Sequence, residues 1–409
     1  MNKKRFSFAG VLSLLSLSML SAADGEIKQE DVDALREWIN SKRMVTVKEL
    51  GGELSFAGDI HAEMQRAYEK KNGVKQRGNQ LNIPAQTYDM EFNFSVDYRT
   101  DRSWAAARLR FDNDMGVTTE PVGSGKTNGI KVDRAYIGYR LVDGDQHTFD
   151  VELGRRPLSF VLDSRIQFGS NCDGVIFKDN YAFDKAGDFY YQLGSMVVNE
   201  KHSQLAYFAE LGLLNIGRSG LYVKYSLLDW DTHNASGIPY QFDFIVSQAI
   251  LGYKFIPVKF DRLIHFYLSG LYNTRASRLP ISNYQRANWG GYGGFSIGQI
   301  KRKGDWSFDA NYQFVGAQAI PNFDSLGIGL GSNSNASFYY TKEKDTTKIN
   351  SRSTAEGNVN FKGFELTFQY LLSNNLNIYQ QYKQAQNWNK NIGPRKSFKQ
   401  YEVDFIYTF

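Results

Sequence analysis

The sequence predicts an all-β fold, a transmembrane antiparallel β-barrel of about 16 strands with a short N-terminal periplasmic helix. Three observations carry this prediction. From Gly52 to the C-terminus, apolar and polar residues alternate in segments of about ten residues separated by turns. Aromatic residues make up 15% of the chain, yet its mean hydropathy is only −0.45. After the N-terminus, no stretch stays apolar for the roughly 18 residues that a transmembrane helix needs.

Composition also excludes several classes of protein. The single cysteine, Cys172, excludes an intrachain disulfide scaffold and a zinc site built from several thiolates. The chain has 48 Lys and Arg against 43 Asp and Glu, which is too even a balance for a nucleic-acid-binding protein. The five histidines do not have the spacing of metal ligands, so we expect no metal and no cofactor.

Residues 1–23 have the three parts of a secretory signal peptide. Basic residues at positions 3–5 precede an apolar run over residues 11–20, and small residues follow at positions 21–23. We therefore expect secretion through the inner membrane and cleavage after Ala23; the alternative is a membrane anchor. Three of the positive charges in the net charge of +5 belong to this segment.

Residues 24–51 are expected to form a periplasmic N-terminal helical segment. Val32, Leu35 and Ile39 fall on one helical face between positions 29 and 43, with acidic residues in the first turn and basic residues in the last. A packing helix or periplasmic stub is one interpretation. A helix that enters the lumen or mediates contacts between subunits is the other.

Residues 52–409 are expected to form the barrel itself. In the segment 87–99, Phe92, Phe94 and Val96 alternate with polar residues, and the C-terminal segment shows the same pattern. The predicted strands are 52–66, 87–99, 103–113, 129–142, 146–156, 173–179, 188–199, 203–215, 219–231, 241–256, 259–274, 288–302, 304–318, 358–372, 375–388 and 396–409. Short connections follow even-numbered strands and long ones follow odd-numbered strands, as in outer-membrane barrels. Exceptions at 180–187 and 200–202 leave the count open by two between residues 173 and 215.

A soluble β-sandwich also alternates, but its single core rarely serves more than roughly 250 residues. Here the alternation continues to the end of the chain without a linker, and the polar faces carry many full charges. These features favour a water-filled lumen inside a closed barrel.

The general pattern of the chain and several local stretches resemble a known family. The signal peptide, the alternating strands and the terminal Tyr407-Thr408-Phe409 resemble a Gram-negative outer-membrane porin. The stretch 36–43, running into 48–52, is similar to the N-terminal part of chlamydial-type porins. The stretch 153–157, followed by 164–168 and 173–174, is similar to their third-loop region and more distantly to carbohydrate- and phosphate-selective porins.

The resemblance implies a location and several partners. It implies a barrel in the cell outer membrane, in contact with outer-membrane lipids, through which small hydrophilic solutes diffuse passively. It implies that Tyr407 and Phe409 form a C-terminal signal for the barrel assembly machinery, and that the chain is a homotrimer. It also implies that the third external loop folds into the lumen and narrows it.

The charged residues of the predicted strands and of the third loop independently indicate a charged constriction where that loop would narrow the lumen. Arginines on the polar faces of the third to fifth strands would face acidic residues and an arginine of the third loop, creating a field across the pore. The candidate constriction residues are Arg108, Arg110, Arg134, Arg140, Arg156, Asp163, Arg165 and Asp173. In the alternative, the arginines merely neutralise neighbouring lumen acids, namely Glu91, Asp97, Asp112, Asp150 and Glu152.

Three functions are compatible with such a barrel. A diffusion channel is the leading prediction, because the chain combines many strands with polar inner faces and has no large plug domain. An adhesin or structural barrel would use the long loop 319–357. A barrel hydrolase needs a nucleophile and a base that meet, and the sequence shows no such pair around His265. We therefore expect no enzymatic activity.

Overall fold

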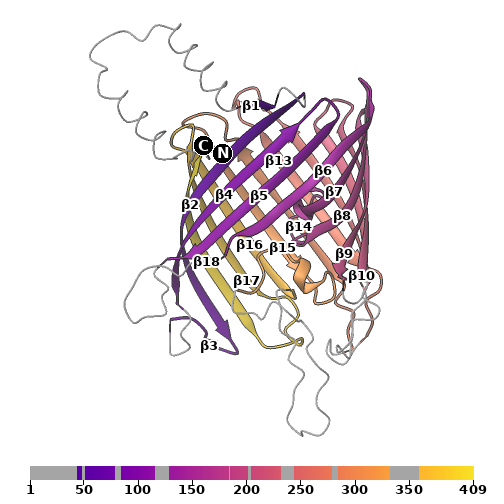
Figure 1. Cartoon of the computed structure of the whole chain (residues 1–409). Coiled ribbons are helices and arrows are strands. Elements are labelled where there is room, and N and C mark those ends of the chain that lie inside the picture. The colour runs from indigo at the N-terminus through magenta and orange to yellow at the C-terminus, as the bar shows by residue number, and fades with distance from the viewer. Residues whose placement is uncertain are drawn as a thin grey trace, which may run out of the picture.

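The chain closes on itself as an antiparallel β-barrel (Figure 1). The computed structural model describes residues 44–47, 51–78, 84–115, 129–183, 185–200, 204–231, 244–278, 284–331 and 359–409. Each strand pairs with its neighbours in sequence, and the last strand, β18, pairs with β2 over 13 residue pairs from Lys396–Lys71 to Thr408–Asp59. This pairing removes the free edges of the sheet, so every barrel strand has two partners.

Within the described ranges, sixteen long strands build the wall, as the alternation predicts. They are β2 (Gly52–Lys71), β4 (Gln86–Arg99), β5 (Ser103–Asp114), β6 (Lys131–Asp143), β7 (His147–Pro157), β8 (Asn171–Phe183), β9 (Gly187–Asn199), β10 (Gln204–Ile216), β11 (Leu221–Trp230), β12 (Phe244–Phe255), β13 (Ile264–Asn273), β14 (Trp289–Gly298), β15 (Trp306–Val315), β16 (Phe361–Leu371), β17 (Leu376–Asn387) and β18 (Lys396–Thr408). The strand count of 16 is confirmed.

The region between residues 173 and 215 differs from the prediction in its details. β8 is much longer than the predicted strand 173–179, because it begins at Asn171 and continues to Phe183. β9 begins at Gly187, four residues after β8 ends, so the longer connection expected over 180–187 is not present. β10 begins at Gln204, five residues after β9 ends at Asn199.

Two short strands accompany the wall. β1 (Met44–Val47) pairs antiparallel with the start of β2, so this part of the expected helical segment 24–51 is a strand. β3 (Val74–Lys75) pairs with the far end of β2. The signal peptide over residues 1–23 and the helix over residues 29–43 lie outside the described residues. In the part of the chain that the structure describes, no helix is long and apolar enough to cross a membrane.

The two faces of the wall differ as the alternation predicts. On β13, Phe266 and Leu268 point outward and are 49% and 63% exposed, whereas the intervening Tyr267 and Ser269 are buried on the inner side. The same division recurs on β12, where Leu251 is exposed. The outward side chains of these two strands are therefore apolar and exposed.

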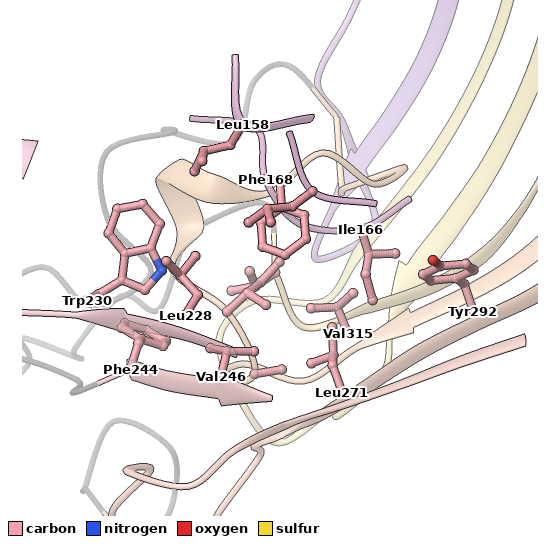
Figure 2. Close-up of a cluster of buried hydrophobic side chains, with 14 of the residues drawn as sticks. Leu158, Ile166, Phe168, Leu228, Trp230, Phe244, Val246, Leu271, Tyr292 and Val315 are labelled. Carbon is pink, nitrogen blue, oxygen red and sulfur yellow. The ribbon is translucent and has the colours of Figure 1, made fainter. Parts of the chain in front are cut away.

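An apolar core lies inside the barrel, which the alternation alone does not predict. Figure 2 shows the side chains of Leu158, Ile166 and Phe168 packed against residues on the inner faces of β11 to β15. The labelled wall residues are Leu228, Trp230, Phe244, Val246, Leu271, Tyr292 and Val315. Leu158, Ile166 and Phe168 come from a loop between β7 and β8, so this loop is folded into the lumen.

Candidate pore constriction

Residues 158–170, which we call L3, form the third external loop and begin with the short 3-10 helix η1 (Leu158–Phe160). Pro157 ends β7 and is the N-cap of η1, with a φ of −59° and a ψ of 129° that are not helical. Leu158, Ile166 and Phe168 are fully buried in the lumen core, and Leu162 is 1% exposed. Burying each of these side chains stabilises the folded loop by roughly 1.5–3 kcal/mol. Apolar contact thus holds L3 against the wall of β11 to β15.

Polar contacts fix the same side of L3. Asp163 pairs through Oδ2 with Lys224 Nζ on β11 at 2.8 Å, and its N–H donates to Glu210 Oε2 on β10 at 3.2 Å. Gln248 on β12 donates to the carbonyl oxygen of Asp163 at 2.7 Å and accepts from Ser164 Oγ at 2.8 Å. L3 is therefore tied to three successive strands.

Arg165 extends this attachment to β15. Its two terminal nitrogens donate to the two carboxylate oxygens of Asp309 at 2.9 and 2.8 Å, and its guanidinium lies 4.2 Å from the ring centroid of Tyr267 on β13. Bidentate pairing and stacking together fix the orientation of a guanidinium. The charges of Asp163 and Arg165 are thus both neutralised by the wall that carries L3.

A second loop covers L3. Residues 316–331, which we call the clamp segment, follow β15 and contain the short 3-10 helix η4 (Asn322–Asp324). Asp324 is fully buried and accepts hydrogen bonds from the N–H groups of Phe168 and Ser170, both at 3.1 Å. Burial raises the pKa of Asp324 to about 7, although both donors act in the opposite direction. The clamp segment is the first part of the loop 319–357; residues 332–358 lie outside the described residues.

On the opposite side of the lumen, Arg108, Arg110 and Arg134 lie on the inner faces of β5 and β6, as predicted. Arg108 and Arg134 are register partners, and a terminal nitrogen of Arg108 lies 3.6 Å from Asp59 Oδ1. Arg134 donates a hydrogen bond to Ser95 Oγ at 3.4 Å. Arg110 pairs with Glu91 at 2.6 Å. These three guanidiniums form one basic patch.

The other predicted arginines are separated from this patch by their own acidic partners. Arg140 pairs with Asp150 at 2.8 Å near the end of β6 that leads into the short connection to β7. Arg156 pairs with Glu152 and lies 4.5 Å from the ring centroid of Tyr136. For these two residues the geometry matches the alternative in which arginines neutralise neighbouring wall acids. The same holds for Arg110, which pairs with Glu91 and lies 3.3 Å from Asp112.

Asp173 requires a correction, because it does not lie in the third loop. β8 starts at Asn171, and Asp173 shares the outward face of that strand with Phe177. Its carboxylate pairs with Arg155 on β7, with two N···O distances of 2.7 Å. Asp173 therefore does not face the lumen arginines.

An acidic patch on the inner wall was not predicted. Its members are Asp59, His61 and Glu63 on β2, Asp89 and Glu91 on β4, and Glu402 and Asp404 on β18. Glu63 is the register partner of both Asp89 and Asp404, and His61 bridges Asp59 and Asp404 at 2.8 and 2.7 Å. Within each strand the acidic residues occupy alternate positions. The acids of β18 become neighbours of those on β2 and β4 only because β18 pairs with β2.

No metal site accompanies these charges: in the described ranges, no group of three His, Cys, Asp or Glu side chains is arranged to hold an ion. His265 on β13 accepts or donates a hydrogen bond with Tyr222 at 2.8 Å. Cys172 is fully buried in β8.

Comparison with known proteins supports the fold. No family model and no curated protein matches the chain. Among solved structures, the high-pH structure of OprB from Pseudomonas putida matches with a TM-score of 0.53 and 11% identity, covering 91% of this chain and 97% of that one. A triple mutant of Rhodopseudomonas blastica porin (TM-score 0.45, 11% identity, 87% and 100% coverage) also matches. So does the outer membrane channel DcaP of Acinetobacter baumannii (0.44, 10%, 88% and 98%). The OprB likeness extends over nearly the whole barrel.

Proposed function

We propose that this chain is a porin of a Gram-negative outer membrane, through which small hydrophilic solutes and ions diffuse passively. The observation that carries the proposal is a closed 16-stranded barrel with an apolar outside, a polar inside and L3 folded against one side of the lumen. Barrels of this strand number are wide enough for an aqueous channel. An outward apolar band is the surface that suits a lipid bilayer.

The charges of the lumen give this channel its selectivity. L3 lies against β10 to β15, and the acidic patch and the basic patch lie on the remaining wall, side by side on β2, β4, β5, β6 and β18. Two patches of opposite sign next to the narrowed lumen produce a field across the path of a solute. In this form the constriction retains Arg108, Arg110 and Arg134, opposed by wall acids rather than by acids of L3.

The remaining parts of the proposal rest on the sequence. The segment 1–23 directs secretion, Tyr407 and Phe409 are recognised by the barrel assembly machinery, and the protein is a homotrimer without enzymatic activity. The relationship to chlamydial-type porins rests on the stretches 36–43 and 153–157.

Channel recordings in planar lipid bilayers test the function directly. Ser95 points into the lumen beside Arg134, and Val96 is the next residue on the opposite face of β4. We expect stepwise conductance for the unaltered protein and a lower step for S95W, because the indole ring would occupy the lumen. V96W is the matched control and should conduct normally. Absence of conductance from correctly folded protein would refute the proposal.

A further inference from the structure

A pocket at the external rim, away from the lumen charges, has its own chemistry. It lies between the segment before β14, the end of β15, the start of β16 and the segment after β17. Its volume is about 610 Å³, and its lining includes Gln285, Arg286, Trp289, Asn360, Trp388 and Lys390. This volume is within the range of roughly 300–1,000 Å³ that ligand sites occupy. We call it the rim pocket.

The walls of the rim pocket are fixed by hydrogen bonds between segments far apart in the sequence. Asn389 Nδ2 donates to Gln285 Oε1 at 2.6 Å, which joins the segments on either side of the pocket. Asn360 Oδ1 accepts from the N–H of Asn389 at 2.9 Å, and Asn360 Nδ2 donates to the Asn389 carbonyl at 2.9 Å. The pocket is therefore preorganised, which lowers the entropic cost of binding a ligand.

Gly316 lines the pocket at a position where the backbone approaches too closely to leave room for a side chain. Its N–H donates to the Trp289 carbonyl at 2.7 Å, and an added Cβ would lie 2.3 Å from the carbonyl oxygen of Ala287. The tight approach keeps Trp289 at the edge of the pocket.

Two exposed tryptophans supply flat apolar walls. Trp289 is 56% exposed and Trp388 is 37% exposed, and both stand on the outward side of the barrel. The ring of Phe314 meets Trp388 edge-on at 4.8 Å between centroids and holds it in place. Large aromatic faces of this kind pack against the C–H faces of a sugar ring, while the pocket's side-chain amides match its hydroxyls.

The pocket is also basic. Arg286 and Lys390 are exposed in its lining, none of the described lining residues carries a carboxylate, and no described acid forms an ion pair with either cation. Arginine and lysine side chains form strong charge-assisted hydrogen bonds with phosphate oxygens. A neutral sugar would form no ion pair with Arg286 and Lys390, whereas the phosphate of a phosphorylated sugar would pair with both.

We propose that the rim pocket binds a phosphorylated saccharide. The phosphate pairs with Arg286 and Lys390, and a sugar ring lies against Trp289 or Trp388. Because the pocket opens on the outward side of the external rim, the saccharide is either the headgroup of a membrane glycolipid or a free sugar phosphate. This inference does not depend on the conduction of solutes through the lumen.

Calorimetry on the full-length protein in detergent tests the proposal with three probes: diphosphoryl lipid A, glucose 6-phosphate and glucose. We expect at least one phosphorylated probe to bind and glucose to bind at least tenfold more weakly than it does. R286Q/K390Q should weaken binding of the phosphorylated probe at least tenfold. R302Q/K303Q removes the same charge from a periplasmic turn and is the matched control, which should bind as the unaltered protein does.

The two phosphorylated probes distinguish the two sources. Binding of lipid A alone identifies a membrane glycolipid, and binding of glucose 6-phosphate shows that a free sugar phosphate suffices. The proposal is overturned if neither phosphorylated probe binds, if glucose binds equally well, or if R286Q/K390Q and R302Q/K303Q behave alike. Unaltered protein that binds a phosphorylated probe but fails to conduct would contradict the proposed channel and leave the rim pocket intact.

Discussion

The lumen arginines differ in how completely a carboxylate neutralises them. Arg140 and Arg156 each have a close acidic partner on the neighbouring wall, so they add little net field. Arg134 contacts a hydroxyl, and Arg108 lies 3.6 Å from its nearest acid. Arg110 also has a close acidic partner, Glu91 at 2.6 Å, so the unbalanced charge of the basic patch on β5 and β6 depends mainly on Arg108 and Arg134.

Removing the basic patch should make the channel prefer cations. In R108A/R110A/R134A, the acidic patch on β2, β4 and β18 loses its opposing charges, so anions meet a higher barrier. We expect the cation-to-anion permeability ratio, measured from reversal potentials across a salt gradient, to rise roughly twofold or more. R102A/R302A/K303A removes three charges from periplasmic turns as the control. An unchanged reversal potential in the first variant would exclude the patch from selectivity.

The sequence predicts which charged residues face the lumen better than it predicts which side chains they pair with. The alternation correctly put Arg108, Arg110 and Arg134 on the inner face, because the side-chain period of a strand is two. It could not reveal that Asp163 pairs with Lys224 or that Arg165 pairs with Asp309, because these contacts join segments 61 and 144 residues apart. Asp173 was misplaced because it was grouped with the third loop, whereas it stands on the outward face of β8 and its carboxylate pairs with Arg155 on β7.

At the level of the loops, L3 and the clamp segment act as one packed unit. The backbone of L3 donates to the carboxylate of Asp324, and the N–H of Gly169 donates to its carbonyl oxygen at 2.9 Å. The N–H of Leu326 returns a hydrogen bond to the carbonyl oxygen of Ile166 at 3.1 Å. The sequence showed a long polar loop after β15 but contained no sign that its first residues enter the barrel.

The contact between these loops should weaken as pH rises. The pKa of Asp324 is raised from 3.8 to about 7, so the folded state holds the proton over a range in which the unfolded state has lost it. The contact is thus most stable below the pKa of the unfolded state. It loses about 1.4 kcal/mol of stability for each pH unit between that pKa and the folded-state pKa near 7. We expect hydrogen-exchange protection of the Phe168 and Ser170 amides to fall between about pH 4 and about pH 7 and to change little above that.

D324N provides the comparison, because an amide does not titrate in this range. Its protection factors should be lower at the acidic end, where one acceptor oxygen is lost, and should then change little with pH. Equal pH dependence in D324N and the unaltered protein would assign the effect to another group. D305N, in the turn before β15, serves as the control for removing a carboxylate elsewhere.

For the barrel as a whole, closure between the first and last strands determines what the wall presents to the lumen. The order of strands and their alternation were predicted closely, because each strand carries its own pattern and pairs with a sequence neighbour. The pairing of β18 with β2 was implied by a closed barrel, yet its consequence, the acidic patch, depends on register. His61 bonds to Asp404 across this junction, 343 residues apart in the sequence.

The C-terminal residue completes the same junction. The N–H and carbonyl groups of Phe409 exchange hydrogen bonds with Gly58 at 2.9 and 3.0 Å, and the Phe409 ring stacks on Phe92 at 6.4 Å between centroids. An added Cβ at Gly58 would lie 2.4 Å from the Phe409 ring, so the glycine leaves the space that the ring occupies. Phe409 therefore contributes to closure in addition to its proposed role as an assembly signal.

Replacing Phe409, which directly follows β18, separates these two roles when the variant is compared with one that replaces an outward phenylalanine of β18. F405A removes an outward phenyl ring of similar exposure, 48% against 46% for Phe409, so both variants lose comparable apolar contact. If Phe409 is recognised during assembly, F409A should reduce the amount of heat-modifiable barrel in isolated outer membranes several-fold more than F405A. Both purified variants should refold into detergent with similar yields, because refolding bypasses the assembly machinery. Equal losses of F409A and F405A in membranes would show that Phe409 acts only through packing at the barrel junction.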